Sequence, residues 1–204
     1  MLLLRSGNWV ACANGGIGDI YTNLEKIKVP KYNVTPIDEE NKFDEHEIIV
    51  SKTDIKGRLV YVNDVFARVA EMTTAEVINQ PHSIIRHPDM PRVVFKLLWE
   101  AIEAGKEIFA YVKNMSKTGK YYWVIAHVTP SYDASGEING YHSNRRLPAQ
   151  KSIDKVSAIY KSLLSEEKKH ANAKDGLEAS HEMFVSMLKD EGKSYSEFVW
   201  SLGN

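Results

Sequence analysis

The sequence has almost no cysteine, no charge bias and no long apolar run. Cys12 is the only cysteine among 204 residues, so neither an intramolecular disulfide nor a cysteine-rich zinc site can form. The 26 basic and 27 acidic residues leave a net charge of −1, which gives no overall attraction to nucleic acid or to an anionic membrane. No apolar run reaches the roughly 18 residues that a membrane-spanning helix needs. We therefore expect a cytoplasmic protein that binds no nucleic acid and does not insert into a membrane.

The common catalytic and metal-binding signatures are also missing. The sequence contains no G-x-S-x-G nucleophile elbow, no P-loop and no kinase signature. His82, His87 and Asp89 are possible zinc or iron ligands, but their spacing matches no helical i, i+4 pair, and no nearby cysteine or glutamate completes a tetrahedral set. These absences predict a protein that is not an enzyme.

The chain divides into three regions. Residues 1–43 carry little periodicity and predict a loosely ordered leader, whereas residues 149–204 show helical spacing throughout. Between them, residues 44–148 combine short β-branched runs with short helical patterns and turn sequences, which indicates an α+β domain. The expected strands of this domain are residues 47–54, 57–63, 106–115, 120–130 and 137–146, and its longest expected helix is 91–105. A capping box from Thr73 to Glu76 predicts the start of a shorter helix.

The final region predicts a helical appendage of two or three amphipathic helices. Two long patterns cover residues 152–169 and 175–192, and a capping box from Ser194 to Glu197 opens a third helix. We expect the apolar side of the appendage to cover an exposed face of the sheet. A signalling helix that pairs with a second copy of the chain is the alternative.

A proline-bounded bend precedes the helix at 91–105. Prolines fix φ and restrict the preceding residue, so residues 83–91 should form a short, stiff bend that holds Arg86, His87 and Asp89 in set directions. An arginine offers several donors to a phosphate or ribose oxygen, and the first N–H groups of the helix that Pro91 opens also favour an anion. A solvated loop with a surface ion pair is the alternative explanation for these three residues.

Asn114 is a polar residue at the end of an apolar strand face. Alternation over residues 106–115 places it on the same side as three apolar residues, so its amide needs a backbone group, water or a heteroaromatic edge as partner. A capped strand end explains it equally well. Trp99 and Trp123 are individually more typical of a core than of a cofactor wall. Taken together with the bend, these residues favour a pocket in a small α+β core.

Specific motifs then indicate a family. The stretches "KTDIKGRLVYVNDVF", "PHSIIRHPDMP", "YVKNMSKTGKYYWV" and "GYHSNRR" closely resemble the PAS domain of the Aer-type aerotaxis transducers, continuously from about residue 48 to residue 146. The resemblance implies a five-stranded antiparallel sheet with flanking short helices and a pocket that holds FAD non-covalently. By this resemblance, the flavin-retaining residues fall on Arg86, His87 and Asp89, the tryptophan of the long helix on Trp99, and the signalling-sensitive asparagine on Asn114. Asn63 and Trp123 complete our set of candidate cofactor-binding residues.

The resemblance implies a redox or oxygen (energy) sensor that signals by protein–protein contact. We expect its partner to be a chemoreceptor-type signalling protein on a separate chain, with a homodimer as a further possibility. One alternative is a haem-binding PAS gas sensor with His82, His127 or His142 as axial ligand. Another is a cofactor-free PAS interaction module. A flavin photoadduct is not expected, because Cys12 is far in sequence from the pocket helix.

Overall fold

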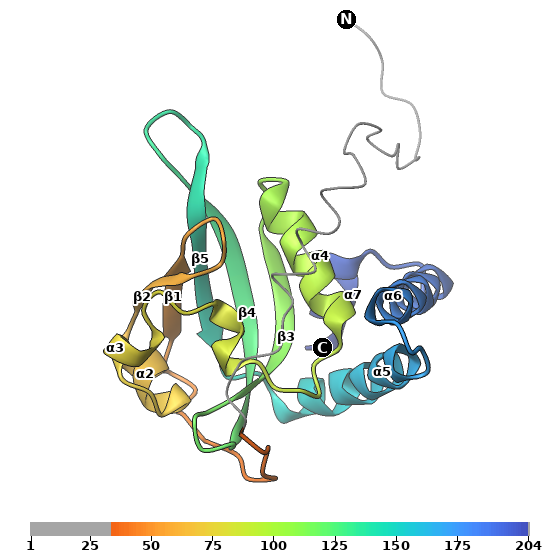
Figure 1. Ribbon diagram of the computed structural model, residues 1–204. Helices are drawn as coiled ribbons and strands as arrows, with labels where there is room; N and C mark the ends of the chain where they lie inside the picture. The colour runs from red at the N-terminus through yellow and green to blue at the C-terminus, as the bar shows by residue number, and fades with distance from the viewer. Residues whose placement is uncertain (1–33, 204) are drawn as a thin grey trace, which may run out of the picture.

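Five antiparallel strands form one sheet in the spatial order β2-β1-β5-β4-β3 (Figure 1). The computed structural model describes residues 34–203, so most of the predicted leader and Cys12 lie outside the described residues. The strands are β1 (Ile49–Thr53), β2 (Leu59–Val62), β3 (Ile108–Met115), β4 (Tyr121–Tyr132) and β5 (Ile138–Arg146). The predicted antiparallel sheet of five strands is confirmed.

Short helices follow β2, and three longer helices follow β5. They are α2 (Asp64–Ala70), α3 (Thr74–Val77), the 3₁₀ turn η1 (His82–Ile85), α4 (Arg92–Glu103), α5 (Gln150–Lys168), α6 (Ala173–Asp190) and α7 (Tyr195–Leu202). The predicted capping boxes at Thr73–Glu76 and Ser194–Glu197 are both present. None of the helices between residues 34 and 203 is long and apolar enough to cross a membrane.

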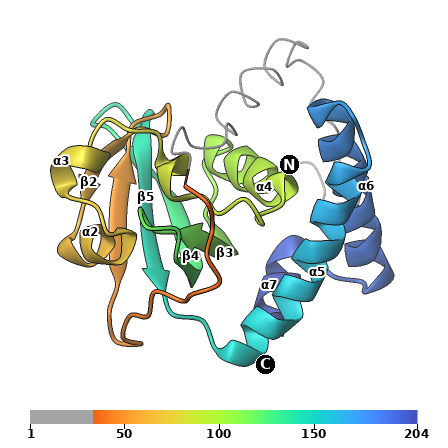
Figure 2. The ribbon, with the colours of Figure 1, turned by 60° about the horizontal axis from the view of Figure 1, so that its bottom comes forward.

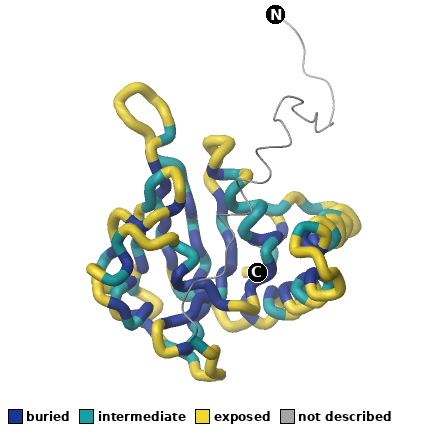
Figure 3. The backbone as a smooth tube through the Cα atoms, in the orientation of Figure 1, coloured by how far each residue is buried: buried dark blue, intermediate teal, exposed yellow. Residues whose placement is uncertain are grey.

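The inner face of the sheet carries the core of the domain. On β3, Ala110, Val112 and Asn114 point inward and are buried, as strand alternation predicts. Helices α2, α3 and α4 lie over this face, and the strands beneath them are largely buried (Figure 3). The side chains packed between α4 and the sheet therefore belong to the part of the core where a pocket was expected.

The appendage of α5, α6 and α7 packs around the edge strand β3 (Figure 2). The hydroxyl of Tyr160 on α5 donates to the carbonyl of Tyr111 at 2.8 Å, and the Tyr160 ring stacks on Trp123. On α7, Trp200 packs on Phe109 with the ring centroids 4.8 Å apart. The expectation that the appendage covers a sheet face is confirmed for β3 and β4.

The start of α4 is held by a carboxylate from α5. Oε1 of Glu167 accepts the backbone N–H groups of Arg92 at 2.6 Å and Val93 at 3.3 Å, and Oε2 accepts from Nε of Arg92 at 2.9 Å. The sequence correctly predicts that this helix N-terminus attracts an anion. In the structure the anion is a side chain of the same protein.

The buried hydroxyl of Tyr160 gives a direct test of how the appendage is attached. Replacing Tyr160→Phe leaves the Tyr111 carbonyl without its donor, and we expect the free energy of unfolding to fall by about 1 kcal/mol. Tyr132→Phe is the matched control, because its hydroxyl also donates to a backbone carbonyl, that of Gly105, but its side chain is exposed. Urea denaturation followed by circular dichroism measures both, and equal effects of the two variants would contradict the packing described here.

Candidate functional site

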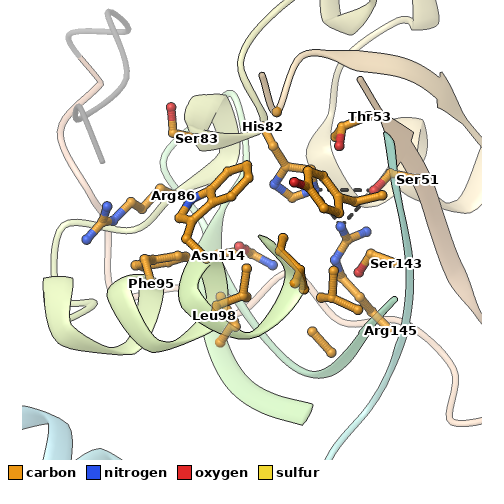
Figure 4. Close-up of a pocket in the computed structure, with 17 residues that line it drawn as sticks. Ser51, Thr53, His82, Ser83, Arg86, Phe95, Leu98, Asn114, Ser143 and Arg145 are labelled. Carbon is orange, nitrogen blue, oxygen red and sulfur yellow. Dashed lines mark hydrogen bonds between the residues drawn. The ribbon is translucent and has the colours of Figure 1, made fainter. Parts of the chain in front are cut away.

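A cavity of about 100 Å³ lies between α4, η1 and the inner face of the sheet (Figure 4). One water needs roughly 10–15 Å³ of such space, so this hollow is much larger than a packing defect. Its walls are mostly apolar and include Phe95, Leu98 and Trp99 of α4. Trp99 meets Tyr141 of β5 edge to face, with ring centroids 5.5 Å apart. The cavity is therefore closed on one side by aromatic and aliphatic groups of α4.

Three buried polar atoms of the opposite wall have no hydrogen-bond partner. They are Nδ2 of Asn114, Oγ of Ser143 and one terminal nitrogen, Nη1, of Arg145. All three residues line the cavity, because Asn114 lies on the inward register of β3 and the other two lie on that of β5. A buried donor without a partner costs about 1–3 kcal/mol, so native structures rarely keep three around one hollow. The arrangement indicates a ligand whose edge accepts hydrogen bonds.

Arg145 is a buried cation at the back of the cavity. Its other terminal nitrogen donates to Oγ of Ser51 at 2.8 Å and to Nε2 of His82 at 2.5 Å. Burial lowers the pKa of Arg145 only to about 10, so the guanidinium stays charged at neutral pH. Burial and the neighbouring guanidinium lower the pKa of His82 to about 3, which keeps its ring neutral and able to accept. Within residues 34–203 no carboxylate forms an ion pair with Arg145.

Arg86 lies at the mouth of the cavity. Its guanidinium carbon is 3.9 Å from the centroid of the Phe95 ring, and its backbone pairs with that of Asn114 in an isolated bridge. Figure 4 shows the guanidinium directed away from the other lining residues. Arg86 also lines a second, outer cavity of about 220 Å³, together with residues of the bend and of α5. Arg86 and Asn114, predicted separately from the sequence, are therefore brought together.

His87 and Asp89 lie outside the inner cavity. His87 is buried and lines the outer cavity, and burial lowers its pKa to about 4. Its Nδ1 accepts the backbone N–H of Asp89 at 3.1 Å. The carboxylate of Asp89 pairs with Lys113 at 2.9 Å. These two residues therefore flank the mouth beside Arg86 and do not touch the inner cavity.

The structure separates the other predicted site residues. Trp99 lines the cavity, as expected. Trp123 lies on the outer face of β4 against Tyr160, so it contacts the appendage. Asn63 caps α2 by accepting from the N–H of Phe66, it also accepts from the N–H of Val50 in β1, and it does not line the cavity. Asn63 and Trp123 therefore do not lie with the other predicted site residues. Asn63 caps a helix, and Trp123 faces the opposite side of the sheet.

The polar residues of β5 that line the cavity were not predicted from the sequence. Ser143 and Arg145 were not proposed, although the alternation that singled out Asn114 also places Tyr141, Ser143 and Arg145 on one face of "INGYHSNRR". A cation on the inward register of a central strand was the available signal.

The residues that line the cavity fit a flavin ring better than a haem or a metal. Asn114 and Arg145 present donors, and the pyrimidine edge of a flavin presents ring nitrogens and carbonyl oxygens that accept. His127 and His142 project from the outer face of the sheet, and Nε2 of His82 already accepts from Arg145, which leaves no ready axial ligand among the three. No group of three or more metal-ligating side chains occurs in the described part of the chain.

The cavity would have to enlarge to take a flavin. Ligand pockets usually span about 300–1,000 Å³, whereas this space is about 100 Å³. Phe95, Leu98 and Trp99 of α4 are half-buried side chains that line it. A flavin ring would fit only if these side chains changed position.

Comparisons with known proteins find similarity over the central part of the chain. The family model described as "PAS fold" matches residues 59–144. The aerotaxis receptor of Escherichia coli (strain K12) is 36% identical over 115 residues, which cover 56% of this chain and 22% of the receptor. The nitrogen fixation regulatory protein of Klebsiella oxytoca is 23% identical over 99 residues, covering 48% of this chain and 20% of that protein. The chain thus spans about a fifth of the length of these curated relatives.

Solved structures give a looser similarity. The light-state structure of the blue-light photoreceptor Aureochrome1 LOV matches with a TM-score of 0.47 and 17% sequence identity, covering 60% of this chain and 91% of that one. The sheet order and the helices on its inner face are those of the PAS fold, whose family model matches residues 59–144.

Proposed function

We propose that the inner cavity binds FAD and that the protein is a non-enzymatic redox or oxygen sensor. The observation that carries this proposal is the set of three unpartnered polar atoms, on Asn114, Ser143 and Arg145, that face an otherwise apolar cavity. The sequence resemblance to Aer-type PAS domains and the 36% identity to the aerotaxis receptor support it. A chemoreceptor-type signalling protein on a separate chain is the proposed partner.

Different residues would contact different parts of the cofactor. Asn114 and Arg145 would donate to the acceptor edge of the ring, and Trp99 and Phe95 would close the ring against the sheet. Arg86 would meet the ribityl-diphosphate tail at the mouth, since it lines both the inner and the outer cavity. When bound, FAD supplies reversible one- or two-electron transfer, which changes the charge of its ring.

Strand β3 offers a route from the cavity to the surface. Val112 and Asn114 face the cavity. The backbone carbonyl of Tyr111 accepts from Tyr160 of α5, and the side chain of Lys113 pairs with Asp89 of the bend. A unit charge about 4 Å from a polar group is worth roughly 4 kcal/mol at an effective dielectric of 20, which exceeds the 1–3 kcal/mol of a typical allosteric coupling. A rotation of the Asn114 amide would therefore alter the position of β3, and with it the contact between β3 and the appendage.

An absorption spectrum of the purified protein tests the proposed cofactor. We expect flavin bands in the blue and near ultraviolet that bleach when dithionite is added. An intense Soret band would instead establish the haem sensor, and a colourless protein to which added FAD does not bind would leave a PAS interaction module.

The unpartnered amide of Asn114 makes a second prediction. Asn114→Leu removes a buried group that lacks a partner, so the free energy of unfolding of the ligand-free protein should rise by about 1 kcal/mol, while FAD affinity falls about tenfold through one lost hydrogen bond. Asn63→Ala is the control: it removes a helix cap and should lower stability by about 1–2 kcal/mol without lowering FAD affinity. Fluorescence titration and urea denaturation measure the two quantities, and an Asn114→Leu protein with full affinity would contradict the assigned role.

A further inference from the structure

The carboxylate of Glu167 links the appendage to the mouth of the cavity. Its side chain is only 3% exposed, and it accepts from the Arg92 side chain and from two backbone N–H groups at the start of α4. The acceptor lies in the appendage, and all of its donors lie in the PAS domain, about 75 residues earlier in the sequence. This contact therefore depends on where α5 lies relative to α4.

The outer cavity around Glu167 has more positive than negative charge. Arg86, Arg92 and Lys168 line this space of about 220 Å³, and Glu167 is the only carboxylate among its lining residues. His87 also lines it, but burial and Lys113 lower the pKa of His87 to about 4, so the ring adds no charge at neutral pH. Three cations around one carboxylate suit a ligand with more than one negative charge, such as a diphosphate.

Arg86 connects the two cavities. It lines the inner cavity beside Phe95 and the outer cavity beside Glu167 and Leu164. A dinucleotide with its ring in the inner cavity would leave past Arg86, because Arg86 lines both spaces and its guanidinium points away from the other residues of the inner cavity (Figure 4). The anionic tail would then arrive at the place where the Glu167 carboxylate already lies.

The donors at the start of α4 are already taken. The Glu167 carboxylate accepts from the N–H groups of Arg92 and Val93 and from Nε of Arg92. At Gly176 of α6, an added Cβ would lie 2.5 Å from the backbone carbonyl oxygen of Glu167, so α6 packs tightly on this end of α5. A phosphate that binds the same donors must displace the carboxylate, and the end of α5 moves with it.

We propose that Glu167 is a built-in competitor for the anionic tail of the cavity's ligand. A dinucleotide phosphate takes the place of the carboxylate at Arg86, Arg92 and the first N–H groups of α4, and this exchange releases the end of α5 and the neighbouring α6 from the PAS domain. The inference rests on the proposed FAD function for the ring, but the competition itself concerns only the tail.

ADP tests the competition without a flavin, because it carries the same diphosphate. We expect ADP to bind cofactor-free Glu167→Gln at least fivefold more tightly than the wild-type chain, measured by isothermal titration calorimetry on the full 204-residue protein. Glu166→Gln is the matched control, since the adjacent Glu166 pairs with Lys169 and His170 and does not line the outer cavity, so its ADP affinity should equal that of the wild type. Equal or weaker ADP binding to Glu167→Gln, or no binding to either chain, would overturn the proposal.

Hydrogen exchange of the unmodified chain gives a test that needs no variant. ADP and FAD should each speed the exchange of amides in α6 and the last two turns of α5, and slower exchange there would show that the tail strengthens the contact.

The two proposals fail separately. If FAD does not bind while ADP still prefers Glu167→Gln, only the flavin function is lost, and if FAD binds wild type and Glu167→Gln equally, only the competition is lost.

Discussion

The structure depends on an edge strand that is buried on both faces. Successive side chains of β3 point to opposite sides, so every second residue faces the cavity and the residues between them face the appendage. An unprotected edge strand offers free backbone groups to other chains, and here the Tyr160 hydroxyl occupies one of them, the carbonyl of Tyr111. The same strand therefore forms a wall of the inner cavity and the support on which α5 and α7 pack.

The buried polar groups of this small domain differ in how completely they are hydrogen-bonded. The buried cluster of Ser51, His82 and Arg145 satisfies most of its hydrogen-bonding groups internally. Of the five buried side-chain atoms without partners in the described residues, three belong to residues that line the inner cavity, and the other two, on Ser180 and Tyr195, lie in the appendage. A buried guanidinium that no carboxylate neutralises is costly, so Arg145 is the most unusual member of this set.

Much of the fold could be predicted from local patterns, because each depends on neighbours in the sequence. Alternation identified β3, and the Thr73–Glu76 and Ser194–Glu197 spacings identified two helix starts that the structure contains. Asn63 shows the limit of this reasoning. Its residue type suits a cap and a ligand contact equally, and only the three-dimensional path of the chain, which carries it away from the cavity, decides between them.

Contacts between distant parts of the chain could not be predicted in this way. The sequence indicates that the α4 N-terminus attracts an anion, but nothing local to Arg92 shows that Glu167 supplies it. Arg145 was missed for a related reason: a cation on a central strand reads as a surface residue until the neighbouring strands that bury it are known.

The attachment of the appendage has a consequence for assembly. Because α5 contributes the donor that occupies the Tyr111 carbonyl, a molecule whose last helices have swung away exposes this peptide group on the edge of β3. The bend still covers the same edge at Lys113 and Asn114, so only the first half of β3 becomes available for pairing with another strand. The form of the protein with released helices would then be the form that associates with another chain. In the closed form, the helices of the appendage cover this edge of β3.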